Sequence, residues 1–332
     1  MPLLAKIPII AAISLVMVFG LVILGIGVRN VWRAMASNKW PKVQGTVVES
    51  GTSTSVTTDR KTGIETTTHH ANVTFSYQVG GKSYTTDTIH FGQTLGSGSS
   101  SDAELRHRRY PVGAPVSISY YPGDPSIATA KPGVYPDVFW VLGAGLAFVL
   151  PCLVALLVFL SSELSMRGLG LGLGIFAILF CMVGGAMLTA GLERLWHGYA
   201  SQYWPVADGV IVYQQQEAST SVTRDDEGTT ERSTSYGTSL VFQYEVGGKT
   251  HFSDTRRFGH LDAAGKDWAD EIARRYPKGA RVKVAYCPSD PDLATLEPGI
   301  TSEAYWLPGA GLVLLLFGLA ALVWGAPALS RV

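Results

Sequence analysis

The sequence predicts a membrane protein with four transmembrane helices and two α+β, β-rich domains outside the membrane. Two observations lead to this prediction. The chain contains four long apolar runs without a charged residue, and it contains two polar segments that carry the same motifs in the same order. A second half that repeats the first indicates a tandem parallel repeat. We expect each copy to consist of a helix, a domain of β-β-β-α-β-β order, and a second helix.

The apolar runs set the membrane prediction. They cover residues 7–28, 138–160, 169–192 and 304–328. Each is at least as long as the ~20 residues that a helix needs to cross a bilayer. A helix buried in a soluble core would show a polar stripe, and these runs show none. The first run is long for a signal peptide and continues into Arg29 and Trp32 without a clear cleavage site, which favours an uncleaved anchor.

Overall composition excludes several classes of partner. The net charge is zero, with 26 basic and 26 acidic residues, so nothing favours a nucleic acid. Two of the three cysteines lie inside apolar runs and the third, Cys287, is alone in its domain. That pattern predicts neither a disulfide framework nor a metal site. The apolar runs contain no ionisable residue, which argues against an ion-coupled pump.

The polar domains, residues 31–137 and 193–303, share three motifs. These are Trp-Pro, Phe-x-Tyr-x-Val-Gly-Gly-Lys and Arg-Arg-Tyr-Pro-x-Gly. The motifs begin at Trp40 and Trp204, at Phe75 and Phe242, and at Arg108 and Arg274. A residue that recurs in both copies is explained more readily by structure than by catalysis, because a catalytic residue would usually be needed once.

The sequence of each polar domain predicts five strands and one helix. In the first copy, residues 43–58 and 64–79 alternate as strands, and Gly80-Gly81 makes a tight turn into a third strand. A capping box at Ser101 begins a helix that ends before Pro111, and two short strands follow. The second copy repeats this order. We expect a small antiparallel sheet or partly closed barrel with one helix.

A serine- and threonine-rich stretch recurs at residues 53–57 and 219–223. Its β-branched residues are typical of a ribbon that projects from the sheet and offers an edge to a partner. The same composition is typical of a loop without regular structure. The sequence leaves both interpretations open.

Two helices in each copy place both polar domains on one side of the membrane. Parallel copies predict a pseudo-two-fold axis along the membrane normal and domains that pack side by side. The first domain carries more basic than acidic residues and the second the reverse, which favours their pairing. Basic flanks such as Arg29 and Arg33 lean towards the cytoplasm, but long loops weaken that rule and the side is not determined.

The candidate chemical groups are few. His69, His70 and His90 are possible metal ligands on neighbouring strands, although the second copy lacks them. Asp87 and Asp254 recur without a predicted acid or base partner, so a turn-binding carboxylate is the better interpretation. The arginine pairs at Arg108 and Arg274 suit helix ends, with phosphate or lipid headgroups as the alternative. We therefore predict no catalytic residue, no cofactor and no metal.

The combination of these motifs resembles a family of membrane-anchored domains described as domain of unknown function 3592. The resemblance covers both copies and implies spanning helices on either side of each domain, but no activity or cofactor. The leading hypothesis is a non-enzymatic binding or scaffold protein whose partner is a protein or the envelope and headgroup surface. A transporter or channel accessory subunit is the first alternative, and a membrane-bound hydrolase acting through Asp87 and Asp254 is the second.

Overall fold

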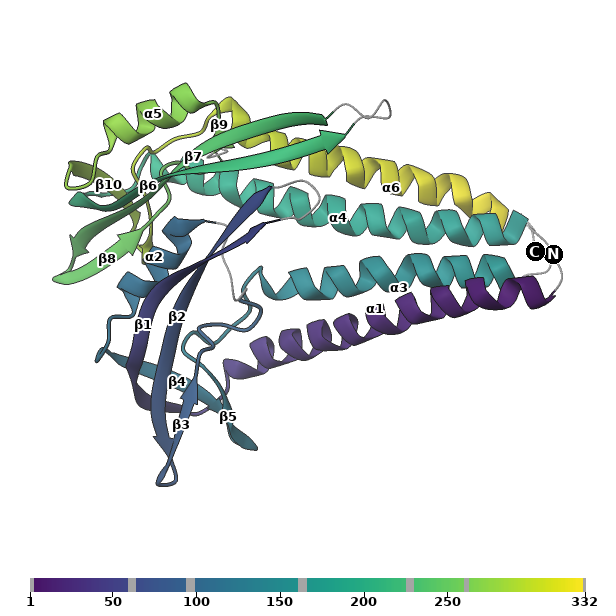
Figure 1. Cartoon of the computed structure of the whole chain (residues 1–332), viewed down its shortest axis with the longest axis horizontal. Helices are drawn as coiled ribbons and strands as arrows, with labels where there is room; N and C mark the ends of the chain where they lie inside the picture. The colour runs from purple at the N-terminus through teal and green to yellow at the C-terminus, as the bar shows by residue number, and fades with distance from the viewer. Residues whose placement is uncertain are drawn as a thin grey trace.

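The computed structural model describes residues 3–58, 64–93, 99–160, 166–224, 230–259 and 263–330. Four long helices run side by side, and both β-rich domains lie at the same end of them (Figure 1). The helices are α1 (Leu3–Ser37), α3 (Val138–Leu160), α4 (Met166–Ser201) and α6 (Trp306–Ser330). The chain order places α1 and α3 around the first domain and α4 and α6 around the second, as the repeat predicts.

Three helices are long and apolar enough to span a membrane. These segments are Ile10–Ser37, Ala177–Ser201 and Ser302–Ala321. The run at 138–160 is also helical, as α3, but the apolar part whose side chains are described, Val138–Leu153, is shorter. Among the described residues the prediction of four transmembrane helices is thus supported for three of them.

Glycines bring the two helices of each copy into close contact. A Cβ atom on Gly27 or Gly145 would lie within 2.6 Å of backbone atoms of Leu142 or Leu24, so α1 and α3 approach as closely as glycine allows. The matching contacts recur between α4 and α6 at Gly191 and Gly311 (Cβ 2.5 Å from the facing backbone in each case). Small residues permit this packing in membrane helices. The duplication therefore extends from the domains into the helices.

The first domain is a five-stranded antiparallel sheet in the order β3-β2-β1-β4-β5. Its elements are β1 (Lys42–Thr58), β2 (Glu65–Val79), β3 (Lys82–Thr86), α2 (Ser100–Arg109), β4 (Pro115–Tyr121) and β5 (Asp124–Thr129). Gly80 and Gly81 have φ of 58° and 80°, the left-handed values that the predicted two-residue hairpin turn requires.

The second domain repeats this sheet in the order β11-β10-β6-β7-β8, with one addition. Its elements are β6 (Val206–Arg224), β7 (Thr230–Val246), β8 (Lys249–Ser253), β9 (Ala263–Ala264), α5 (Lys266–Arg275), β10 (Arg281–Cys287), β11 (Asp290–Thr295) and the short 3-10 helix η1 (Ser302–Tyr305). The two-residue strand β9, which the sequence does not predict, pairs with β7 at Tyr236 and Gly237.

Each sheet curls towards closure around an apolar core. Thr86 on β3 donates its hydroxyl proton to the carbonyl of Ala128 on β5 (3.2 Å), and Ser253 on β8 does the same to Ala294 on β11 (2.9 Å). Phe75 and Phe242 are fully buried at matching positions inside the two sheets. The partly closed barrel with one helix, one of the two predicted arrangements, describes both domains.

The serine- and threonine-rich stretches form paired ribbons. β1 pairs with β2 out to Thr58 and Glu65, and β6 pairs with β7 out to Arg224 and Thr230. The structure thus favours the ribbon over the irregular loop, and the turn residues 59–63 and 225–229 lie outside the described residues. The β6–β7 ribbon runs alongside the long helices, whereas β1 and β2 lie at a steep angle to them (Figure 1).

A buried serine fixes each domain to its leading helix. Ser37 donates to the carbonyl of Ala34 (2.7 Å) and accepts from the amide of Gly133 (2.9 Å), and Ser201 and Gly299 repeat the second bond at 3.0 Å. Trp40 follows this point and is only 8% exposed, packed on Phe91. A tryptophan just past a helix end often lies at the headgroup level of a membrane, but Trp40 lies in a small core between helix and domain.

Candidate functional site

A polar cleft opens in the first domain beside strand β2. Its volume is 380 Å³, within the range of small-ligand sites. It is lined by Glu49, His70, Ala71, Asn72, Val73, Thr74, Asp87, Ile89, Gln93, Asp102 and Arg106. Consecutive residues of β2 take part, so the cleft follows the edge of this strand, and helix α2 forms its opposite wall.

The helical wall of the cleft is an ion pair. Asp102 and Arg106 are one turn apart on α2, and the guanidinium reaches both carboxylate oxygens, at 3.0 and 3.2 Å. Both side chains are partly buried. Two parallel bonds hold the guanidinium plane in a fixed orientation. This wall is therefore charged and ordered.

The loop after β3 forms the floor and rim. The side-chain oxygen of Gln93 accepts from the amides of Ile89 (2.8 Å) and His90 (3.3 Å), and its amide nitrogen donates to the carbonyl of Asp87 (2.8 Å). One glutamine thus ties the loop into a tight curve. The Asp87 side chain is exposed at the rim, and Glu49 on β1 accepts a long bond from Thr74 (3.4 Å).

The matching place in the second domain is filled. α5 aligns with α2, so Trp268 and Ile272 stand where the first copy has Asp102 and Arg106. Ile272 is buried in the core of the second domain, and Trp268 packs against that core. The guanidinium of Arg256, at the position of Ile89, lies 5.3 Å from the centre of the Trp268 ring. The cleft exists because two apolar side chains of one copy are replaced by an ion pair in the other.

The other face of α2 docks on the second domain. Ser100 donates its amide to the Glu217 carboxylate (2.8 Å), and its hydroxyl bonds to the same oxygen. Ser101 donates to Asp254 (3.3 Å), while Arg109 donates to the carbonyls of Phe252 (2.9 Å) and Asp292 (3.2 Å). Figure 1 shows α2 between the strands of the two copies.

This docking confirms that the domains pack on each other, but it does not follow a two-fold axis. α5 contacts mainly strands of its own domain, β6, β7 and β9, while α2 contacts strands of both domains. The contact is thus made mainly by one helix of the first copy on strands β6, β7 and β8 of the second. A two-fold axis would require α5 to make the same contact on the first domain.

Charges across this interface are complementary, as the domain composition suggests. Lys131 of the first domain lies 3.8 Å from Asp292 of the second. Burial, with the charge of Asp102 added, raises the pKa of Asp254. The pKa of Asp292 is lowered in spite of burial, because His251, Arg109 and Lys131 favour its charged form. Acidic groups of the second copy therefore face cations and hydroxyls of the first.

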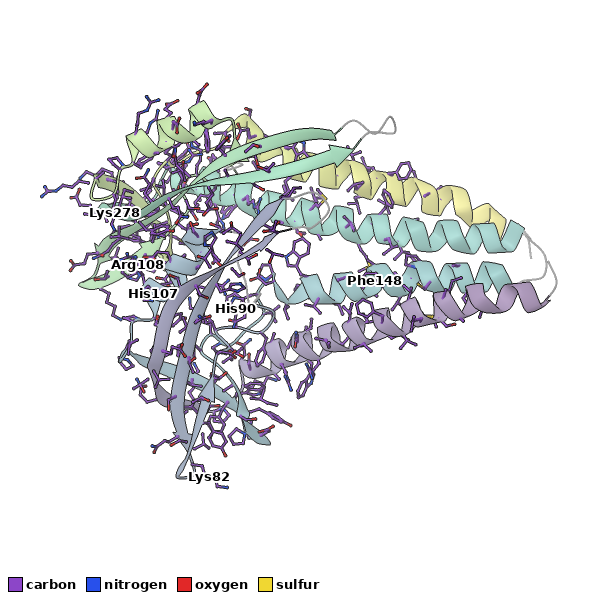
Figure 2. The ribbon with its side chains drawn as sticks, viewed as in Figure 1. Lys82, His90, His107, Arg108, Phe148 and Lys278 are labelled. Carbon is purple, nitrogen blue, oxygen red and sulfur yellow. The ribbon has the colours of Figure 1, made fainter. Side chains whose placement is uncertain are left out.

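The predicted histidine candidates do not come together. His69 bonds to Thr54 (3.3 Å) and His70 to Ser55 (3.1 Å) across the ribbon. His90 lies 3.7 Å from Asp137, and burial lowers its pKa. Figure 2 shows His90 in the loop region of the first domain, away from the ribbon tip. Within the described ranges, no three of histidine, cysteine and acidic side chains gather as a metal ligand set would.

The repeated carboxylates and arginines have different places in the two copies. Asp87 lies at the cleft rim and Asp254 at the domain interface. Both arginine pairs lie in the last turns of α2 and α5, as the sequence predicts. Within these turns Arg108 pairs with Glu104 (2.7 Å) and Arg275 with Glu271 (2.8 Å). Figure 2 marks Arg108 and His107 on α2 near the second domain.

Asp102 and Arg106 are the cleft residues that the sequence analysis missed. Arg109 belongs to the arginine pair that the sequence assigns to the helix end, and its bonds to the second domain were not predicted. The available signal was the apolar spacing of Trp268, Ile272 and Tyr276, which the first copy lacks. The helix start also differs from prediction. Ser99, rather than Ser101, caps α2 by accepting from the Ser101 amide, because the Ser101 side chain reaches across to Asp254.

Comparison with protein families agrees with this architecture. A model described as domain of unknown function (DUF3592) matches residues 43–135 and 207–301, one match in each copy and together more than half of the chain. No curated protein matches the chain.

Proposed function

The chain belongs to the DUF3592 family as a tandem member, and from this premise we propose that it is a non-enzymatic, membrane-anchored binding protein. The first domain binds a partner protein in its cleft, and the second domain is the platform that holds the cleft wall in place. The observation that supports this proposal is the divided use of α2, which docks on the second domain with one face and lines the cleft with the other.

The role of the second domain as a platform follows from the contacts that fix α2 in place. Its own domain contributes part of the contact, including a bond between Ser50 and His107 (2.9 Å). The second domain adds bonds to Ser100, Ser101 and Arg109. A helix held on two sides keeps Asp102 and Arg106 in one arrangement, and a preorganised site loses less entropy on binding. Trp268 fills the matching position of the second domain, so its described residues form no equivalent cleft there.

For the anchor we propose four crossings, with α3 as the fourth. α3 packs on α1 through Gly27 and Gly145 as α6 packs on α4 through Gly191 and Gly311. Phe148 of α3 also meets Phe19 of α1 edge to face, with ring centres 5.7 Å apart (Figure 2). An even number of crossings in each copy leaves both domains on one side of the membrane.

A site-specific photo-crosslinker tests the proposal in cells. We place it at Asn72, which is exposed at the cleft, and in a control variant at Gln78, which is exposed on the same strand away from the cleft. A protein adduct at Asn72 and none at Gln78 supports the proposal. No adduct at Asn72, the same adducts at both positions, or adducts with lipid alone would contradict it.

A further inference from the structure

We infer that the edge of strand β2 beside the cleft is a site of β-strand addition, which takes an extended segment of the partner protein with small side chains as a further strand of the first sheet. The inference rests on the proposed binding function and specifies how the partner is held. Three observations carry it. The matching edge is paired in the second copy, no described strand pairs with it in the first, and the cleft opens beside it.

The second copy closes the matching edge of β7 with its own chain. Strand β9, which consists of two alanines, pairs with β7 at Tyr236 and Gly237. One residue further along β7, the hydroxyl of Thr238 donates to the carbonyl of Ala269 on α5 (2.9 Å), so the helix is fastened to the strand there. The fold therefore accepts an extended segment with small side chains at this edge.

The first copy differs at both points. β2 pairs with β1 over residues 65–77, but it pairs with β3 only from Phe75 onwards. Among the described residues, no strand adjoins β2 on that side before Phe75. Ala71 stands where the second copy has Thr238, so the hydroxyl that fastens the helix to the strand is missing.

The sequence also lacks a good counterpart of β9. The matching stretch, residues 96–98, reads Gly-Ser-Gly and lies outside the described residues. Glycine is depleted in strands, because it has no side chain to pack and loses more entropy than other residues. The two alanines of the second copy are thus replaced by a sequence that is less suited to pairing.

The edge of β2 presents backbone groups at alternate residues. The two-residue turn at 80–81 closes on Val79 and Lys82, a pair that exchanges both backbone bonds. The direction of these bonds has a period of two along an antiparallel strand. Ala71 and Val73 therefore direct their N–H and C=O groups to the same side as Val79, at a level that β3 does not reach. Both residues line the cleft, so an added strand would bond to them there.

The dimensions of the cleft define the occupant. Asp102 and Arg106 on α2 form the wall opposite the edge, and the cleft between them has a volume of 380 Å³. This space suits the backbone of an extended segment whose side chains towards the helix are small, as the alanines of β9 are. In strand addition the backbone bonds supply affinity, and the side chains that enter the cleft supply specificity.

The first test is amide hydrogen exchange of the full-length protein in nanodiscs, resolved to single residues. The amide of Asn72 points to β1 and should be protected, whereas the amides of Ala71 and Val73 should exchange about tenfold faster or more. Equal protection of all three amides would show that residues 94–98 or a second copy of the chain already pair with the edge. That result overturns the inference.

The second test is a titration of the same sample with a blocked five-residue peptide that has threonine at both ends and three central alanines. The control peptide carries N-methyl groups on the three alanines, which removes backbone donors and keeps the side chains. We expect saturable binding of the first peptide, slower exchange of Ala71 and Val73 when it binds, and about tenfold weaker binding of the control. No saturable binding, or equal binding of both peptides, overturns the inference.

Two proline variants locate the binding. Ala71→Pro removes an edge amide but no bond to β1, which an edge strand tolerates, and should weaken peptide binding about tenfold or more. Thr67→Pro is the matched control, because Thr67 lies on the same side of β2 but outside the cleft lining, and it should have no effect. The thermal midpoint shows whether each variant folds. Undiminished peptide binding by folded Ala71→Pro overturns the inference, and if that variant does not fold, the N-methylated peptide decides.

The outcomes separate this inference from the proposed function. If the peptide does not bind but the protein adduct at Asn72 persists in Ala71→Pro, the binding function stands and strand addition is wrong. If the peptide binds through its backbone but no protein adduct forms at Asn72 in cells, strand addition stands and the proposed function fails. If neither the peptide nor a protein binds, both fail.

Discussion

Helices α2 and α5 occupy the same position in two copies of one domain, yet they face different surroundings. α5 turns Trp268 and Ile272 to its own core and a charged face to solvent, with Lys266, Asp267 and Glu271 exposed. α2 turns an ion pair to its own domain, while Ser101 and Arg109, one turn on either side of the buried Leu105, bond to the other domain. The two helices thus differ in their contacts: α5 packs on the core of its own domain, whereas α2 packs partly on the other domain.

The charged face of α5 also explains why α5 does not dock on the first domain in the way that α2 docks on the second. The positions of α5 that match Ser101, Leu105 and Arg109 are Asp267, Glu271 and Arg275, all exposed, and the last two pair with each other at 2.8 Å. Docking this face would remove three charges from water, which is costly without partners. The comparison teaches that the same helix position on one scaffold can present either a face that docks on another domain or a face exposed to solvent.

The largest expected effect tests whether the two cores are equivalent. Phe75→Ala and Phe242→Ala each remove a fully buried ring. We expect each to lower the free energy of unfolding by about 3–5 kcal/mol, because both leave a cavity that the sheet cannot close. Denaturant unfolding in detergent, followed by tryptophan fluorescence, measures the loss. If one copy tolerates the change, the two domains do not share one packing plan.

The next largest effect distinguishes α5 from α2 by the loss of stability when the matching residue of each helix is replaced by alanine. Ile272→Ala should cost about 2–4 kcal/mol, since Ile272 is buried in the core. Arg106→Ala, at the matching position, should cost about 1 kcal/mol or less, as expected for a partly exposed ion pair within one helix. The same unfolding experiment compares them. Equal losses would show that Arg106 has a core function and that the cleft wall is misassigned.

A smaller effect concerns the docking face. Leu105 is buried, and its neighbours one turn away bind the second domain. Leu105→Glu installs the residue of the second copy and should weaken docking by about 1–3 kcal/mol, because a polar group enters an apolar contact. Glu271→Leu is the reciprocal control and should leave docking unchanged.

Crosslinking measures that docking. Ser99 and Ser239 have side-chain oxygens 3.3 Å apart across the interface, so cysteines at these positions report on contact between the domains. In a background without Cys152, Cys181 and Cys287, the disulfide should form readily in the parent and slowly in Leu105→Glu. Rapid formation in both would place Leu105 outside the docking contact.

The smallest effect is a pH dependence at the interface. The pKa of Asp254 is raised by burial and by Asp102, so its neutral form fits the folded protein better than its charged form. The stability that the neutral form contributes is complete below the ordinary value of 3.8 and is lost as the pH rises through the raised pKa. Asp254→Asn keeps a neutral acceptor for Ser101 and should raise the thermal midpoint at pH 7 more than at pH 4.

Asp87→Asn serves as the matched control for that pH series. Asp87 is the repeat partner of Asp254 but is exposed at the cleft rim. Its substitution should leave the thermal midpoint unchanged at both pH values. A pH-dependent gain in both variants would show that the gain does not come from the domain interface.

Local patterns explain how much of the fold was predictable. The apolar runs, the alternation around Phe75 and Phe242, and the Gly80-Gly81 turn each specify their own element, because burial period and positive φ are properties of a few neighbouring residues. The failures were at long range. Trp40 follows directly after a long apolar helix, yet it is buried against Phe91, which is distant in sequence.

The sequence by itself determined the repeat, the apolar helices and the β-β-β-α-β-β order of elements along each domain. Only the tertiary structure decided that α2 docks on the second domain and that Asp87 and Asp254 have different environments. It also decided that the first domain has a cleft at the place that Trp268 fills in the second domain. The physical reason is that a strand or helix is encoded by local periodicity, whereas an interface or a cleft depends on which distant side chains fill the space between elements. Two related domain sequences can therefore encode one fold and two different surfaces.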